Sequence, residues 1–291
     1  MLRMKYSISD LLQMYRRYRM QVFFLLLLLV SALLLVFKSR ILTLAVLAAA
    51  LIFHFIFVRR QQQAYNRAFV QANLENTLCP KFGMDTIYEK DVTHMTPDIL
   101  HHARLMPFRQ AADTPLLCWE LHGKLRGMSV TMCDTALAQD FTLVNKGKNR
   151  VHFNTGVWTH LELLKDTGLD FRLLDETSVP TPIRMEFFSK EALCITGPLH
   201  DDELAKNFVL YHPINGKAPC LPGRFLRELK KLKDYTPGYV ALSVRGSQMD
   251  IFIRGRFLAM PVSVKRAPTK EMMCFDPFPE LLYLLDLASA L

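Results

Sequence analysis

Two uninterrupted apolar stretches dominate the hydrophobic pattern at the start of the chain. Val22–Phe37 has 16 residues without a charge, Ile41–Val58 has 18, and the polar residues 38–40 separate them. As helices they would reach about 24 and 27 Å, close to the roughly 30 Å hydrocarbon core of a bilayer. The pattern predicts a two-helix transmembrane hairpin over residues 21–60, with spans at 22–37 and 41–58. The alternative is a single signal-anchor followed by a core helix.

Amphipathic and polar segments flank this predicted hairpin. Residues 1–20 form an amphipathic basic lead, in which Ser7 can cap a helix and Asp10 lies in the first turn. Its apolar and aromatic side comprises Leu11, Leu12, Tyr15 and Tyr18. The alternative is that the lead simply continues the first span into the cytoplasm. Residues 61–80 contain no Gly, and no Pro before Pro80, so they predict a helical stalk.

From residue 81 onward the pattern changes between periods of two and of 3.6 residues. Leu117–His122 and Met128–Cys133 alternate apolar and polar positions around a Gly-containing turn, which predicts a β-hairpin with one buried face. Thr96, followed by Pro97 and Asp98, is typical of a helix start. Further strands are predicted at 150–164 (leading into a short helix), 183–188, 191–197, 239–246 and 249–255, and helices at 222–235 and 279–291. Because strands and helices mix without regular alternation, residues 81–291 are predicted to form an α+β domain.

The net charge of +9 is confined to the region of the apolar stretches. Residues 1–67 hold ten Lys or Arg and one acidic residue, so the remainder of the chain is neutral. This placement suits anionic lipid headgroups and argues against nucleic-acid binding. Five basic residues precede the first span, two lie in the turn and three follow the second span. By the positive-inside rule we expect a multi-pass protein of the cell (plasma) membrane, with both termini and the main domain in the cytoplasm.

Two groups of basic residues are candidates for contact with the membrane surface. The first group flanks the predicted spans, and the second follows one face of the helix predicted at 222–235. They comprise Arg16, Arg17, Arg19, Arg59 and Arg60, and then Arg224, Arg227, Lys230 and Lys231. For the second group, the alternative is an ordinary solvated helix face.

A longer stretch of the domain shows a recognisable order of motifs. Between residues 202 and 262 it combines a strand at Phe208–Tyr211, a helix start at Leu221-Pro222, a basic helix over Phe225–Leu232 and a hairpin ending at Met249–Pro261. This arrangement resembles the bacterial family called domain of unknown function 3137, over about residues 85–264. The chain departs from the family pattern at residues 212–213 and at 220. The resemblance implies a membrane-tethered cytoplasmic domain and supplies no catalytic residues.

The six cysteines offer little redox or nucleophilic chemistry. No C-x-x-C pair occurs, which argues against a zinc ribbon or a redox motif, and in the cytoplasm the thiols should be reduced. Cys118 and His122 share a strand face but lie about 13 Å apart, too far for a nucleophile–base hydrogen bond. Cys133, on the neighbouring strand, is the residue that could approach His122.

Other titratable clusters also admit plain structural explanations. His101 and His102 are neighbours on a helix and point apart, although His94 could join one of them. The acidic run at 200–204 could hold a divalent cation, but its carboxylates also suit the first turn of a helix. No Walker loop, G-x-S-x-G or G-x-G-x-x-G is present. We therefore expect no catalytic residue, no metal ligand and no cofactor.

These observations favour a binding or scaffold protein with a regulatory role. In this hypothesis the hairpin anchors an α+β domain that recognises a protein partner or a lipid surface, and the hairpin can support a homo-oligomer. The alternative is a membrane-tethered enzyme, such as a hydrolase, with a site assembled from scattered residues. A pore or transporter component is disfavoured, because the spans contain no Asp, Glu, Lys, Arg, Gly or Pro.

Overall fold

The computed structural model divides the chain into two compact units. One unit is Met1–Pro80 with Met260–Asp276, and the other is Lys81–Ala259 with Pro277–Leu291. The structure describes residues 6–82, 87–89, 91–103, 105, 116–140, 151–175, 194–236, 238–258, 262 and 264–291. The sequence grouped residues 260–276 with the α+β domain, whereas the structure groups them with the N-terminal helices.

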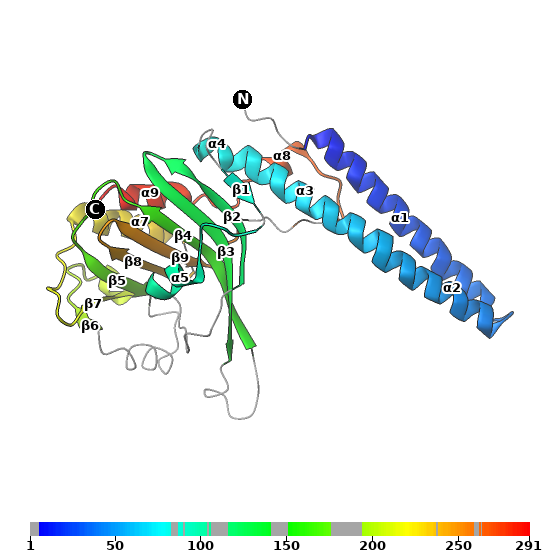
Figure 1. Ribbon diagram of the computed structural model, residues 1–291, viewed down its shortest axis with the longest axis horizontal. Helices are drawn as coiled ribbons and strands as arrows, with labels where there is room; N and C mark the ends of the chain where they lie inside the picture. The colour runs from blue at the N-terminus through cyan, green and yellow to red at the C-terminus, as the bar shows by residue number, and fades with distance from the viewer. Residues whose placement is uncertain are drawn as a thin grey trace. The chain divides into compact units, whose positions relative to one another are not determined.

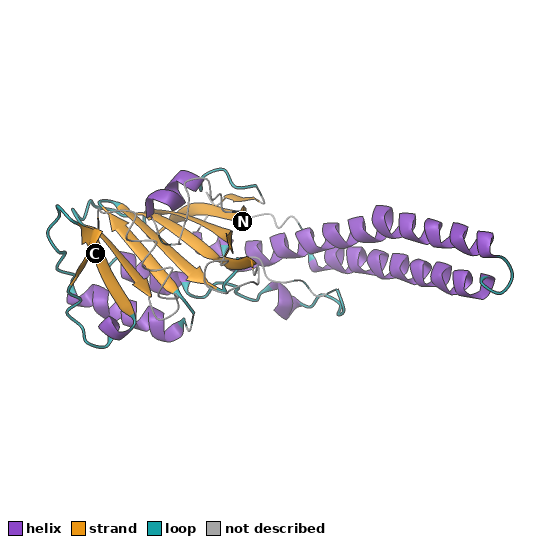
Figure 2. Ribbon diagram, turned by 90° about the horizontal axis from the view of Figure 1, so that it is seen from below, coloured by secondary structure: helices purple, strands orange, loops and turns teal. Residues whose placement is uncertain are grey.

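Long helices make up the first unit. They are α1 (Ile8–Leu35), α2 (Arg40–Phe53), the π-helical segment η1 (His54–Val58) and α3 (Arg59–Thr77), followed by α4 (Cys79–Phe82). α2, η1 and part of α3 lie beside α1 in both views (Figures 1 and 2). Ser7 and Asp10 form a capping box that begins α1, and Ser39 caps the start of α2.

Apolar side chains cover the outside of α1 and α2. The exposed ones include Phe23, Phe24, Leu26, Leu33, Leu34, Leu44, Leu51 and Ile52. Apart from Leu11, the residues that these helices bury are small. They are Ala32, Thr43 and Ala50. By length and composition both helices could cross a membrane. Apolar helices that leave their large side chains outside indicate a membrane location.

Residues 8–20 of the predicted lead belong to α1, which continues without a break into the first apolar stretch. The apolar side of the lead packs on α3 and on the segment near α8 (Lys270–Met273). The buried members of this cluster are Leu11, Tyr65, Ala68, Phe69, Ala72 and Met273. Asn73 of α3 donates hydrogen bonds from Nδ2 to the carbonyls of Met272, at 3.1 Å, and Phe275, at 2.9 Å. These bonds hold residues 272–275 against α3.

Nine strands of the described residues form one antiparallel sheet in the second unit. Its order is β1 (Ile87–Glu89), β2 (Leu116–Leu125), β3 (Met128–Asp140), β4 (Val151–Glu162), β9 (Gln248–Arg254), β8 (Val240–Arg245), β5 (Asp170–Asp175), β7 (Phe208–Pro213) and β6 (Cys194–Gly197). The predicted α+β class and the hairpins β2–β3 and β8–β9 are confirmed. No helix follows β4, where a short loop leads to β5 instead. The strand predicted at 183–188 lies outside the described residues.

The two faces of this sheet differ in chemistry. One face is mainly apolar and packs under α7 (Gly223–Tyr235) and α9 (Leu281–Ala288), for example where Phe171 meets Phe225 edge-on. Both helices were predicted. The opposite face carries α5 (Pro97–Ala103), which also begins where the sequence predicted. Figure 1 shows α5 on the side of the sheet away from α7 and α9. Because side chains alternate along strands, each strand serves both faces.

Candidate functional site

Polar side chains form a row across the sheet face that carries α5. The row follows the strand register, with His122 opposite Thr131, Thr131 opposite His160, His160 opposite Asp250, Asp250 opposite Ser243, and Ser243 opposite Arg172. Except for His122, every member is at most 9% exposed. The next row on the same face is mainly apolar and aromatic, and it includes Cys133, Trp158, Phe252 and Ala241. A buried polar row beside an apolar one requires specific partners or a ligand.

Asp250 lies at the centre of the polar row. Its Oδ1 accepts a 2.9 Å hydrogen bond from Trp158 Nε1 and lies 2.9 Å from His160 Nδ1. Among the described residues, Oδ2 has no hydrogen-bond partner. Burial lowers the pKa of His160, but the hydrogen bond and charge of Asp250 prevail and raise it above its usual value of 6.5. The carboxylate is thus fixed through one oxygen and open at the other.

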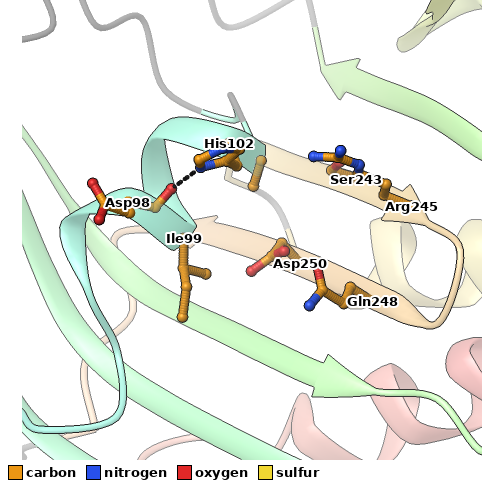
Figure 3. Close-up of a pocket in the computed structure, with 8 residues that line it drawn as sticks. Asp98, Ile99, His102, Ser243, Arg245, Gln248 and Asp250 are labelled. Atoms are coloured by element: carbon orange, nitrogen blue, oxygen red, sulfur yellow. Dashed lines mark hydrogen bonds between the residues drawn. The ribbon is translucent and has the colours of Figure 1, made fainter.

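A pocket of about 210 Å³ lies where α5 meets the polar row. It is lined by Asp98, Ile99, His102 and Ala103 of α5 and by Ser243, Arg245, Gln248 and Asp250 of β8 and β9. Figure 3 shows the α5 residues beside the two strands, with Ser243 and Arg245 on one strand and Asp250 and Gln248 on the other. The pocket therefore combines charges of both signs with two small apolar contacts.

Two buried residues that line this pocket each have a polar atom without a hydrogen-bond partner in the described part of the chain. Ser243 is 4% exposed, lines the pocket and has no hydrogen-bond partner among the described residues. Its hydroxyl is nevertheless not sealed off, because it does not belong to the fully buried atoms that lack partners. Asp250 Oδ2 likewise has no partner among the described residues and does not belong to the fully buried atoms. Polar atoms of this kind are normally satisfied by water or a ligand.

The α5 wall of the pocket is fixed at its start by Glu120 of β2. This carboxylate is 2% exposed and accepts hydrogen bonds from the backbone N–H groups of Thr93, His94 and Met95. Burial raises the pKa of Glu120, but the hydrogen bonds from Met95 and His94 together lower it by more. The pKa of Glu120 therefore lies below its usual value. Glu120 thereby orders the loop that enters α5.

The end of α5 is held by two further side chains. Arg172 Nε donates to the Ala103 carbonyl at 3.2 Å, and the Tyr239 hydroxyl donates to the Leu105 carbonyl at 3.0 Å. Leu100 and Ala103 also pack into the apolar cluster around Trp158. The pocket wall is therefore attached to the sheet on both sides.

Two imidazoles stack near the start of this wall. The rings of His94 and His122 are parallel within 1°, with centroids 4.2 Å apart. His122 Nδ1 lies 2.7 Å from the Thr131 hydroxyl. Burial first, and then the nearby His94, lower the pKa of His122. The pair helps to fix the loop and does not line the pocket.

The candidate nucleophile Cys133 is placed unfavourably for catalysis. It is fully buried, it lies opposite Glu120 rather than His122, and burial raises its pKa to about 12. A register shift between Cys118 and Glu120 breaks the simple alternation, and Trp119 there has a φ of 57°. The proposed approach of Cys133 to His122 is therefore wrong.

The acidic run and the histidines form no metal centre in the described part of the chain. Asp201 accepts hydrogen bonds from the N–H groups of Glu203 and Leu204, so it starts the short 3-10 helix η3 (Leu204–Lys206). Of the predicted histidine group, His94 contacts Glu120 and His102 lines the pocket. The side chain of His101 lies outside the described part.

The candidate membrane-contact residues are exposed, although some are already paired. Arg16, Arg17, Arg19, Arg59, Arg60, Arg224 and Arg227 are exposed. On α7, Lys230 forms an ion pair with Glu203, and Lys231 forms one with Glu228 at 2.9 Å. These pairs reduce the basic character predicted for the α7 face.

Sequence reasoning did not select Ser243, Arg245, Asp250 or His160. One local signal was available, since a serine and an aspartate interrupt the apolar runs of β8 and β9. Comparisons of the chain with protein-family models, curated proteins and solved structures found no match. The resemblance to the domain of unknown function 3137 family therefore stays a prediction.

Proposed function

We propose that this protein is a membrane-anchored binding protein whose sheet unit takes a small polar ligand in the pocket beside α5. The observation that carries the proposal is a pair of buried residues that line the pocket, Ser243 and Asp250, whose Oγ and Oδ2 atoms have no partner among the described residues. Convergent polar groups in a preformed hollow are characteristic of ligand sites. Binding of such a ligand would suit the scaffold or regulatory role favoured by the sequence.

The anchor in this proposal is a transmembrane hairpin of α1 and α2. Gln61 Nε2 of α3 lies 3.5 Å from the Met14 carbonyl of α1, which brings the two arginine groups to one level of the helical unit. These groups are Arg16, Arg17 and Arg19 on α1 and Arg59 and Arg60 on α3. Arginines at one level suit the headgroup region of a bilayer. The helices beyond this level would span the plasma membrane, with both termini and the sheet unit in the cytoplasm.

Binding is favoured over hydrolysis by the order of the polar row. Asp250 lies between His160 and Ser243 in the register, so the imidazole contacts the carboxylate and not the hydroxyl. A serine nucleophile needs its base within about 3 Å. In this pocket the tethered-enzyme hypothesis therefore lacks a base for the Ser243 hydroxyl.

A thermal-unfolding screen of the full-length protein in lipid nanodiscs tests the proposal. Small polar metabolites are added singly, and a ligand should raise the Tm of the wild-type protein by mass action. Ser243→Val removes the hydroxyl and fills the pocket floor, so it should abolish the shift. Ser129→Val is the matched control, because Ser129 lies on the same sheet face outside the pocket. No stabilising compound, or equal shifts in Ser243→Val, would contradict ligand binding in this pocket.

A further inference from the structure

The pocket floor and its rim carry opposite charges that do not pair with each other. Asp250 is 7% exposed and lines the pocket, and its Oδ2 has no partner among the described residues, whereas Arg245 is exposed at the rim. No ion pair joins Arg245 to any described residue. From these two charges we infer that the pocket binds a small zwitterion, whose ammonium contacts Asp250 and Ser243 and whose acidic group contacts Arg245. This inference rests on the proposed function.

The floor matches an ammonium group. Trp158 and His160 engage Oδ1 of Asp250, so the carboxylate is oriented before a ligand arrives and Oδ2 is available as an acceptor. The Ser243 hydroxyl on the neighbouring strand adds a second acceptor directly opposite Asp250. An ammonium group has three N–H donors and a positive charge, and a charge-assisted hydrogen bond is about twice as strong as a neutral one.

The rim matches a carboxylate or a phosphate. Arg245 lies opposite Gln248 in the register, two residues along from the Ser243–Asp250 pair, and diagonal neighbours of this kind are about 7–8 Å apart at Cα. Figure 3 shows the Arg245 side chain extending along β8 in the direction of His102. A guanidinium binds carboxylate and phosphate oxygens in a bidentate manner, and the Gln248 amide can add a donor.

The α5 wall favours a ligand with both charges over a simple anion or cation. Asp98 adds a second carboxylate, which would repel an anion that lacked an amine. A ligand with only a positive charge would leave the Arg245 guanidinium without an acidic group to bind. Ile99 and Ala103 of the pocket lining give a short apolar contact for the carbon chain of a ligand. The volume of about 210 Å³ lies below the usual 300–1,000 Å³ of drug-sized sites, so the ligand is small.

Two sources can supply this chemistry, which is an ammonium linked through a short carbon chain to an acid. One is a free molecule, such as an amino acid or an amino-alcohol phosphate. The other is the headgroup of a lipid such as phosphatidylethanolamine. The residues of the pocket recognise the shared charges and not the remainder of the molecule.

Isothermal titration of the full-length protein in nanodiscs of phosphatidylcholine tests the inference. The probes are phosphoethanolamine and β-alanine, with ethanolamine and inorganic phosphate as single-charge controls. We expect one zwitterion to bind at least tenfold more tightly than either control. Arg245→Gln should weaken that binding at least tenfold. The control is Arg227→Gln, which changes an exposed arginine on α7 outside the pocket and should leave binding unchanged. Ser243→Ala should also weaken binding, while the buried Asp250 remains in place.

A second titration distinguishes the two sources. In nanodiscs that contain phosphatidylethanolamine, a lipid ligand would compete with free phosphoethanolamine and raise its apparent Kd. An unchanged Kd would assign the site to a free molecule. Both results support the zwitterion.

Other outcomes would overturn the inference. Equal binding of ethanolamine, spermidine or Mg²⁺ to the wild-type protein and to Arg245→Gln would show a cation site, as would zwitterion binding that ignores Arg245→Gln. The proposed function would still hold in that case if Ser243→Val abolished the ligand-induced rise in Tm. A metabolite screen in which nothing binds would instead remove the proposed function together with the inference.

Discussion

At the scale of single residues, His160 shows how the polar row is balanced. Its imidazole is nearly buried, which alone would favour the neutral form, yet the contact with Asp250 at 2.9 Å favours the charged form more strongly. The folded state therefore binds a proton at His160 more tightly than the unfolded chain does. This difference links the stability of the sheet unit to pH.

The sign of that link gives a prediction. Because the folded pKa of His160 is raised, its contribution to stability is fully present below pH 6.5 and is lost as the pH rises through the folded value. Thermal unfolding of the wild-type protein and of His160→Gln should therefore show a Tm difference that shrinks between pH 6 and pH 8. His122 has a lowered pKa and acts in the opposite sense, so His122→Gln serves as the comparison. A Tm difference that grows with pH would contradict the assignment.

At the scale of elements, α5 is too short to be stable alone. It has seven residues, and isolated helices of that length are marginal in water. Its position depends on contacts at both ends, with Glu120 before it and with Arg172 and Tyr239 after it. The pocket wall is thus held by these few hydrogen bonds and by the packing of Leu100 and Ala103.

Removing the Glu120 carboxylate should loosen α5. Glu120→Ala leaves the N–H groups of residues 93–95 without their acceptor, at an expected loss of about 3 kcal/mol in unfolding free energy. Hydrogen exchange should accelerate at residues 93–103. Glu162→Ala removes an exposed carboxylate on the same face and should change neither quantity. Unaltered exchange at residues 93–95 in Glu120→Ala would show that other contacts hold the loop.

The attachment of residues 272–275 to α3 gives another prediction. Asn73→Ala removes two hydrogen bonds, and we expect about 1–2 kcal/mol of lost stability with faster amide exchange in α8. Gln63→Ala, at an exposed position of α3, is the control. Exchange in α8 that is equal in the two variants would mean that apolar packing alone holds the segment.

At the scale of the whole molecule, the proposed orientation can be measured with thiol reagents. Cys220 is exposed in the sheet unit, and Lys38 is exposed in the turn between α1 and α2. In intact cells, a membrane-impermeant maleimide should label a Lys38→Cys variant at the new thiol. Cys220 should react only after permeabilisation. Labelling of Cys220 from outside would reverse the orientation, and labelling of neither site before permeabilisation would contradict the hairpin.

Local patterns in the sequence predicted elements better than they predicted the site. The helix-start signal at Thr96 and Pro97 marked α5, period-two alternation marked the β2–β3 hairpin, and two largely apolar runs about a turn marked β8 and β9. The site depends on register between strands far apart in the chain, as with His160 and Asp250, whose side chains are 90 positions apart and yet hydrogen-bonded. A single sequence does not contain that pairing. The bulge at Trp119 could not be predicted from the sequence either, because it depends on the register between β2 and β3.

The position of residues 260–276 determines where the protein can be divided. The chain leaves the sheet unit after Ala259, packs Met273 against α3, and returns at Pro277 to form α9. A truncated protein that begins at residue 81 would keep this segment but lose the helix that covers it. Met273, which is 5% exposed beside α3, would then face water together with the already exposed Phe275, and both would favour aggregation. Production of a soluble fragment therefore has to retain α3 or replace residues 260–276 with a polar linker.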